Sequence, residues 1–103
     1  NRLQIDGFNS EILNLEPLAD KWRAFGWEVL EMNGHDWDDI HRTINRAIAV
    51  TGRPAMIIAH TIKGKGCPLV ENKPESHNIK VGDQATYDKF MASVRVGDVA
   101  LPY

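Results

Sequence analysis

The sequence lacks several features that mark whole classes of protein. Its 103 residues contain one cysteine, Cys67, which excludes an internal disulfide and fits a reducing compartment. No apolar run approaches the length of a membrane span, and the first residues are not a basic segment leading into an apolar one. The net charge of −2 provides no basic face for a nucleic-acid backbone. We therefore expect a cytoplasmic protein that binds neither nucleic acid nor membrane.

The composition that remains is that of an ordinary globular protein, with 43% apolar and 25% charged residues. Its most informative stretch is an apolar run at residues 55–59, which does not alternate with polar residues. Such a run is typical of a strand buried on both faces. A short buried helix would look similar, but Pro54 before the run and the glycines after it favour a strand.

A loop rich in glycine and lysine follows this strand. In an open α/β sheet, ligands bind at the carboxyl ends of the strands, so residues 61–66 are the first candidate site. Gly64 and Gly66 would let backbone amides approach an anion, and Lys63 and Lys65 add positive charge. A surface turn with two solvated lysines is the alternative interpretation.

The pattern before this loop predicts a strand, a helix and a strand. Residues 27–32 alternate enough to form the first strand, and Asp36 is a good N-cap for a helix over residues 36–51. A right-handed crossover with parallel strands is the default for this order. The apolar face expected on the helix comprises Trp37, Ile40, Ile44, Ala47 and Ile48.

The flanking segments predict two more helices. Pro17 is placed as the first residue of one, with Leu18, Trp22 and Phe25 on its apolar face, and Asp83 as the cap of another. The last helix is expected to end at Gly97 and to carry an apolar stripe of Tyr87, Phe90, Met91 and Val94. Residues 1–8 are predicted to be an extended segment or a loop, with its pairing partner elsewhere in the fold, and residues 67–82 an irregular connection.

These elements predict an α/β fold with a parallel sheet and helices on both faces. Two strands are too few to bury residues 55–59 on both sides, because one edge and most of one face would stay open. We therefore expect residues 1–103 to be part of a larger sheet rather than a complete folding unit, with the other strands supplied by further sequence.

Three stretches, NRLQIDGF, EPLADKWRAFGWEVLEMNGHD and IIAHTIKGKG, resemble the transketolase family. The similarity is strongest over residues 1–66 and corresponds to the later part of the diphosphate-binding domain, so residues 1–103 would be the C-terminal portion of that domain. The resemblance implies thiamine diphosphate, a divalent metal (Mg²⁺ or Ca²⁺) and transfer of a two-carbon ketol unit between sugar phosphates, as in the pentose phosphate pathway. The partner that it implies is a pyrimidine-binding domain or subunit, in a homodimer or a heterotetramer.

The same resemblance assigns roles to five residues. Asn1, through its side-chain oxygen, and Leu3, through its main-chain carbonyl, match the metal ligands of the family, which suits the preference of magnesium for oxygen. Ile5 matches an apolar residue that packs on the cofactor. Lys63 falls where some members place a lysine near the diphosphate. His77 matches the catalytic histidine between the cofactor diphosphate and the substrate hydroxyl.

Two departures from the family pattern qualify this interpretation. The family usually has tryptophan, histidine, glycine and lysine around the catalytic histidine, whereas Ser76 and Asn78 flank His77 here. The glycine-aspartate-glycine motif that supplies the metal aspartate is not in the sequence, and the glutamate that activates the cofactor belongs to another domain. These 103 residues are therefore not expected to catalyse a reaction alone.

Other functions remain open from the sequence. A related ketol-transferring enzyme, such as a deoxyxylulose-phosphate synthase or a dihydroxyacetone synthase, is the enzymatic alternative. A non-catalytic binding or assembly module that keeps the fold is the alternative from another class. A nucleotide-binding P-loop is disfavoured, because IKGKGC lacks the earlier glycine and the Ser or Thr after its lysine.

Overall fold

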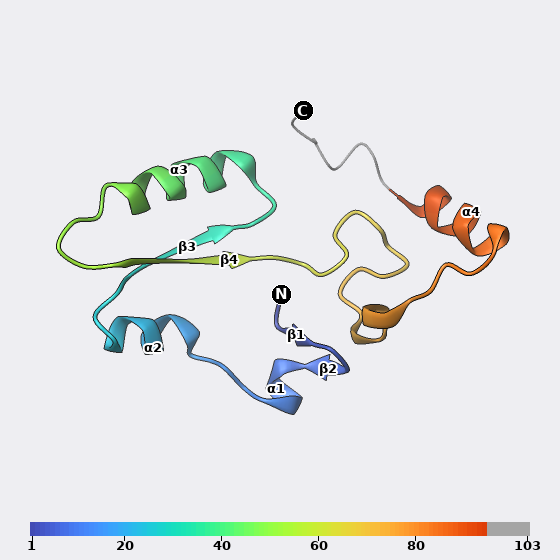
Figure 1. Ribbon diagram of the computed structural model, residues 1–103, viewed down its shortest axis with the longest axis horizontal. Helices are drawn as coiled ribbons and strands as arrows, with labels where there is room; N and C mark the ends of the chain where they lie inside the picture. The colour runs from blue at the N-terminus through green and yellow to red at the C-terminus, as the bar shows by residue number, and fades with distance from the viewer. Residues whose placement is uncertain (95–103) are drawn as a thin grey trace. The chain divides into compact units, whose positions relative to one another are not determined.

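The structure, a computed structural model, describes residues 1–94, which form two compact units (Figure 1). One unit is Asn14–Thr61, and the other joins Asn1–Leu13 to the described residues from Ile62 onward. No helix within residues 1–94 is both long and apolar enough to cross a membrane.

The first unit is built on two parallel strands. β3 (Glu28–Asn33) pairs with β4 (Ala55–His60), with Leu30 opposite Ile57, and α3 (Trp37–Ile48) connects them. The predicted strand at residues 55–59 and its parallel neighbour are therefore confirmed, with β3 beginning one residue later than expected. The burial expected on both faces of β4 is not seen, since residues 55–58 are half-buried and Ala59 is exposed. Leu30 is the buried apolar side chain of this unit, with 6% of its surface exposed.

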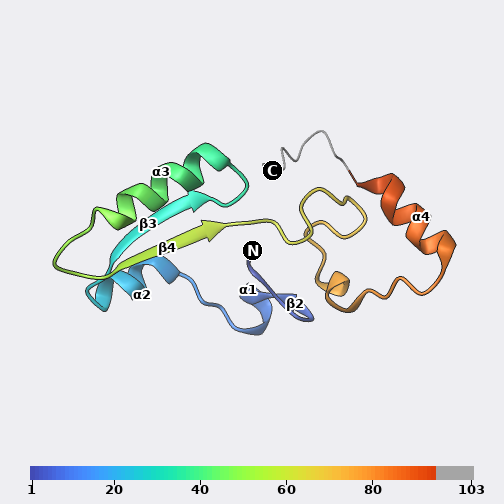
Figure 2. The same ribbon diagram turned by 45° about the horizontal axis from the view of Figure 1, so that its top comes forward.

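Helices lie on both sides of the strand pair. Figure 2 shows α3 on one side and α2 (Leu18–Ala24) on the other, which agrees with the predicted α/β layering. Pro17 is the N-cap of α2 rather than its first residue. Trp22 packs edge-on against Trp27, with ring centroids 5.1 Å apart, but Phe25 was wrongly expected to be covered, since 78% of it is exposed.

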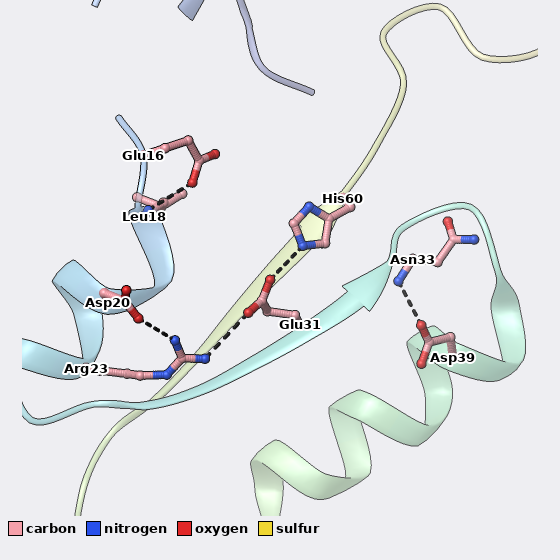
Figure 3. A network of polar contacts seen from close by, with 8 residues as sticks. All are labelled: Glu16, Leu18, Asp20, Arg23, Glu31, Asn33, Asp39 and His60. Carbon is pink, nitrogen blue, oxygen red and sulfur yellow. Dashed lines mark hydrogen bonds and ion pairs between the residues drawn. The ribbon is translucent and has the colours of Figure 1, made fainter. Parts of the chain in front are cut away.

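A chain of polar contacts joins α2 to both strands (Figure 3). Glu31 on β3 accepts hydrogen bonds from His60 Nε2 of β4, at 2.8 Å, and from Arg23 Nη2 of α2, at 3.5 Å. Arg23 also pairs with Asp20 at 2.7 Å. Because these side chains are about half exposed, we expect each pair to add little to stability.

The start of α3 is fixed to the end of β3 by two carboxylates. Asp36 caps the helix as predicted, accepting from the backbone N–H groups of Asp38 and Asp39. Asp39 Oδ2 in turn accepts from the Asn33 N–H at 2.7 Å, and its Oδ1 accepts from Arg42 at 2.7 Å. The hydrogen bond from the Asn33 N–H is the main cause that holds the pKa of Asp39 below its usual value of 3.8; desolvation opposes it, and the charge and hydrogen bond of Arg42 add to the lowering.

The apolar face predicted for α3 is only partly correct. Its most buried side chain is Thr43, at 1% exposure, and Ile40 and Ala47 beside it are half-buried. Three residues expected on this face are instead exposed: Trp37 by 54%, Ile44 by 43% and Ile48 by 76%. The apolar arc of the helix is wider than the strip that two strands can cover.

The second unit contains a hairpin at the start of the chain. β1 (Leu3–Gln4) and β2 (Gly7–Phe8) pair antiparallel with each other, and α1 (Asn9–Ile12) follows. The expectation that residues 1–8 pair elsewhere is therefore wrong, because the turn between β1 and β2 folds the segment back on itself. The Asn9 N–H donates to the Arg2 carbonyl at 2.9 Å and closes the hairpin.

The rest of this unit contains a short 3₁₀ helix, η1 (Pro74–Asn78), inside the connection predicted to be irregular, and then α4 (Gln84–Ser93). Asp83 caps α4 as predicted, by accepting from the Thr86 N–H at 2.8 Å. Phe90 of its predicted stripe is half-buried, whereas Tyr87, Met91 and Val94 are exposed. Gly97, the predicted end of this helix, lies outside the described residues.

We predict that Asp39→Asn in the complete protein lowers the thermal unfolding midpoint at neutral pH. The wild-type carboxylate has a pKa lower in the folded than in the unfolded protein, so its contribution is present above the usual value of 3.8 and is lost as pH falls through the folded-state value. The gap between variant and wild type should therefore narrow in acid. Asp38→Asn is the matched control, since it removes a charge from the same helical turn without the Asn33 contact. Equal effects of both variants would contradict the prediction.

Candidate functional site

The first residues of the chain form a tight turn that holds the Asn1 side-chain oxygen beside Leu3. Asn1 Oδ1 accepts from the Leu3 N–H at 3.0 Å, so the side chain folds over the backbone toward Leu3. An amide oxygen and a backbone carbonyl each have two lone pairs, so one hydrogen bond leaves capacity for a metal ion. Asn1 and Leu3, the two predicted metal ligands, are thus held two residues apart in one turn.

The backbone on both sides of β1 is strained. Arg2 has φ 57° and Ile5 has φ 36°, which is the left-handed region that residues with a side chain rarely adopt. For a β-branched residue such as Ile5 this conformation costs about 1–3 kcal/mol, and such strain collects at functional sites. Ile5, the predicted cofactor contact, is also 52% exposed. An exposed and strained isoleucine fits a role in ligand contact better than a role in packing.

The loop after β4 closes on itself around its glycines. The Asn72 N–H donates to the Lys63 carbonyl at 2.9 Å, and the Cys67 N–H donates to the Gly64 carbonyl at 3.0 Å. Gly64 has φ 70°, and a Cβ there would lie 2.9 Å from Val70 Cγ2 and 3.1 Å from the Val70 carbonyl oxygen. Only glycine fits this position, so the loop is a built feature rather than a loose surface turn.

The two lysines of this loop differ in their partners. Lys65 Nζ lies 3.4 Å from Glu71 Oε1, which offsets its charge. The half-buried Lys63 donates from Nζ to the Pro74 carbonyl at 3.4 Å. Among residues 1–94, no carboxylate pairs with Lys63. Lys63 is therefore the lysine whose charge is available to an anion.

Pro74 begins η1, the 3₁₀ turn that carries His77. Ser76 strengthens this turn, because its N–H and its Oγ both reach the Lys73 carbonyl, at 3.2 and 2.6 Å. The Ile79 N–H donates to the Ser76 carbonyl at 3.5 Å and ends it. The His77 side chain is exposed. The serine that departs from the family pattern thus has a structural role next to the predicted catalytic histidine.

The structure brings all the predicted site residues into one unit. The hairpin that carries Asn1, Leu3 and Ile5 contacts η1 through β2, and Lys63 joins η1 through Pro74. No group of three or more His, Cys, Asp or Glu within residues 1–94 is arranged to hold a metal. The groups that remain are amide and carbonyl oxygens, which are suitable ligands for a hard cation, and the Lys63 ammonium group, which can donate to an anion bound to that cation.

Sequence reasoning missed the contacts of several residues that shape this site. They are Pro74, whose carbonyl receives Lys63; Ser76; and Ser93, whose Oγ lies 3.2 Å from Cys67 Sγ and so ties α4 to the glycine loop. Proline at the first position of a short helix is a known start signal and could have revealed η1. Nothing in the sequence points to the Cys67–Ser93 contact.

Taken together, these features define a class: an α/β protein with loops suited to a metal-bound anion. Comparison with known proteins then identifies the family. The family described as "Transketolase, thiamine diphosphate binding domain" matches residues 1–91. The chain belongs to this family.

Individual relatives agree. The chain is 49% identical over 84 residues to the 6-deoxy-6-sulfo-D-fructose transketolase subunit SqwG of Clostridium sp. (strain MSTE9), covering 82% of this chain and 30% of that protein. It is 45% identical over 78 residues to one of the apulose-4-phosphate transketolase subunits of Phocaeicola vulgatus, covering 76% of this chain and 28% of that one. A crystal structure of transketolase from Campylobacter jejuni superposes with a TM-score of 0.75 at 32% identity, over 89% of this chain and 14% of that chain. The chain thus spans less than a third of the length of these relatives.

We predict that Gly64→Ala destabilises the glycine loop by more than about 1 kcal/mol, because it adds a clash with Val70 to an unfavourable φ. Hydrogen exchange of the Asn72 amide in the complete protein measures this, since that amide closes the loop on Lys63. Gly82→Ala is the control, since a Cβ at Gly82 meets nothing within 4 Å. Faster exchange only in Gly64→Ala is expected; unchanged exchange there would contradict the prediction.

Proposed function

We propose that this chain supplies the metal-binding and diphosphate-binding part of a transketolase that transfers a two-carbon ketol unit between sugar phosphates. The observation that carries the proposal is the contact, within one unit, between the hairpin of Asn1 and Leu3 and the 3₁₀ turn of His77. Two relatives are named as transketolase subunits, one for a sulfo-sugar and one for a sugar phosphate. These names support a ketose with an anionic group at its far end as the substrate class.

The residues divide into three roles in this proposal. Asn1 Oδ1 and the Leu3 carbonyl bind Mg²⁺, or Ca²⁺ in its place, and the metal carries the diphosphate. Ile5 packs against the cofactor, and Lys63 brings positive charge to the diphosphate. His77 reaches the substrate and its hydroxyl. Thiamine diphosphate, when bound, supplies the chemistry that breaks and forms the carbon–carbon bond.

Completion of the active site depends on other sequence in this proposal. A partner subunit or domain with the pyrimidine-binding fold completes the site, in a homodimer or a heterotetramer, and the enzyme acts on sugar phosphates in the cytoplasm. Residues 1–103 are proposed to be the C-terminal portion of the diphosphate-binding domain. The apolar side chains exposed on α3 and at the end of α2, such as Ile48 and Phe25, support this, since they suit burial against further parts of the domain.

A non-catalytic module with the same fold is the second candidate. Its support is the substitution of Ser76 and Asn78 beside His77. Because Ser76 hydrogen-bonds within the turn, its presence does not by itself argue against activity. Cofactor binding without ketol transfer in the complete protein would favour the module.

We predict that Asn1→Ala in the complete enzyme raises the concentrations of metal and thiamine diphosphate needed for half-saturation by at least about tenfold, the loss that follows removal of even an outer-shell partner of a metal. Calorimetric titration with Mg²⁺ and cofactor measures this. Asn14→Ala is the matched control, because Asn14 Oδ1 also accepts from a backbone N–H two residues on, at 3.0 Å from Glu16 N. If Asn1→Ala binds both ligands as the wild type does, the metal assignment is wrong.

We predict that His77→Ala lowers kcat/KM for the ketose by about 100-fold or more, as loss of a proton-transferring group does, while cofactor affinity changes little. Steady-state kinetics with a ketose phosphate, run beside the cofactor titration, separates the two effects. His41→Ala serves as control, because His41 is an exposed histidine whose ring contacts Asn45 on the same helix. A His77→Ala enzyme as active as the wild type would remove the catalytic role from this residue.

A further inference from the structure

The Lys63 ammonium group links two segments that carry different parts of the proposed site. Its main chain belongs to the glycine loop, where the Lys63 carbonyl accepts from the Asn72 N–H at 2.9 Å. Its Nζ donates to the carbonyl of Pro74 at 3.4 Å, three residues before His77. One side chain therefore connects the loop expected to meet the diphosphate with the turn expected to meet the substrate.

The chemistry of the ammonium group allows it to serve both segments at once. An ammonium has three N–H donors and no acceptor, and the Pro74 carbonyl uses one of them. A carbonyl does not neutralise the charge, and within residues 1–94 no carboxylate pairs with Lys63. A half-buried cation with donors to spare favours an anion nearby.

The turn is closed by its own hydrogen bonds and linked to the glycine loop by two lysines. Its internal hydrogen bonds run from the Lys73 carbonyl to Ser76 and from the Ser76 carbonyl to Ile79. Its side-chain links to the glycine loop are Lys63 to the Pro74 carbonyl and Lys73 to the Leu69 carbonyl, the latter at 2.9 Å. The Lys63 link is the longer and so the weaker of the two, and an anion can strengthen it by holding the ammonium in place.

We propose that Lys63 is a positioning residue that couples occupancy by a diphosphate to the position of His77, by donating to the diphosphate and to the Pro74 carbonyl at the same time. This inference rests on the proposed function, since it needs a diphosphate at the glycine loop. It goes further, because it makes the substrate-facing turn respond to the cofactor. By linkage, a turn fixed against Lys63 also strengthens diphosphate binding by the same factor.

The test is hydrogen exchange of the Ser76 and Ile79 amides in the complete enzyme with its partner, with and without saturating Mg²⁺ and thiamine diphosphate. We expect saturation to slow exchange in the wild type by about tenfold, the effect of one charge-assisted hydrogen bond. Lys63→Met, measured at its own saturation, should lose this response. Lys63→Gln keeps a neutral donor for Pro74 but lacks the charge, so it should also lose the response.

Two further variants serve as controls. Lys73→Met removes the other lysine link to the turn and should keep a ligand-dependent slowing, even if its exchange is faster throughout. Lys63→Arg restores a cation with several donors and should recover part of the response. A purely structural role for Lys63 would change exchange equally with and without ligand.

The possible results separate this inference from the proposed function. If the wild-type enzyme shows no saturable binding of thiamine diphosphate, the proposed function fails and the inference fails with it. The inference is overturned, and the proposed function stands, if the wild type binds thiamine diphosphate but exchange of the turn amides does not slow. The same holds if binding slows exchange in Lys63→Met and Lys63→Gln as much as in the wild type. Ligand-dependent slowing of amide exchange that requires Lys63 but not Lys73 supports the inference.

Discussion

Parallel pairing of β3 with β4 is the constraint on which the order of the elements depends. Because the two strands run in the same direction, the chain between them must cross over, and α3 makes that connection. The pairing also places Asn33 opposite His60, so both strands end at the same edge. There the Gly34 N–H donates to the His60 carbonyl at 2.8 Å, and a Cβ on Gly34 would lie 2.5 Å from Thr61 Cγ2. The glycine loop begins a few residues beyond this edge.

Within residues 1–94, the second unit is organised by short-range hydrogen bonds rather than by buried apolar side chains. The Asn1 turn, the hairpin, the glycine loop and η1 are each closed by bonds between residues close in sequence. Few side-chain bonds link the described pieces, among them Lys63 to Pro74 and Cys67 to Ser93. Segments with few buried apolar contacts lie at the low end of local stability. A ligand that touches two such pieces can therefore change their order with one or two hydrogen bonds.

The sequence predicted the parts of the fold that local signals decide. Asp36 and Asp83 cap helices because a carboxylate in that position satisfies free N–H groups whatever surrounds it. The apolar run of β4 needed only its own composition and the flanking Pro54. The covered side of α3 was harder to predict, because periodicity gives an apolar arc and not the neighbour that covers it. The structure buries Thr43 and exposes Ile48, which the apolar pattern of the helix did not indicate.

The hairpin and η1 escaped prediction for a different reason. Strands of two residues are too short for any period to be seen, and the left-handed Ile5 contradicts the preference of a β-branched side chain. Departures from local rules of this kind are typical of functional sites. Composition and spacing alone could not have singled out Asn1, Leu3 or Ile5, and the resemblance to transketolase was what identified them. Only the structure shows that their hairpin contacts η1.

Hydrogen bonds between neighbouring residues shape the turn that carries His77. Ser76 donates twice to the Lys73 carbonyl, from its N–H and from its Oγ, and so closes the turn. The backbone from Lys73 to Ile79 then sets where His77 stands. Because the His77 side chain is exposed and none of these bonds uses its ring, the fold does not depend on the imidazole. The His77 side chain is therefore accessible to a ligand, and Lys63 joins its turn to the glycine loop.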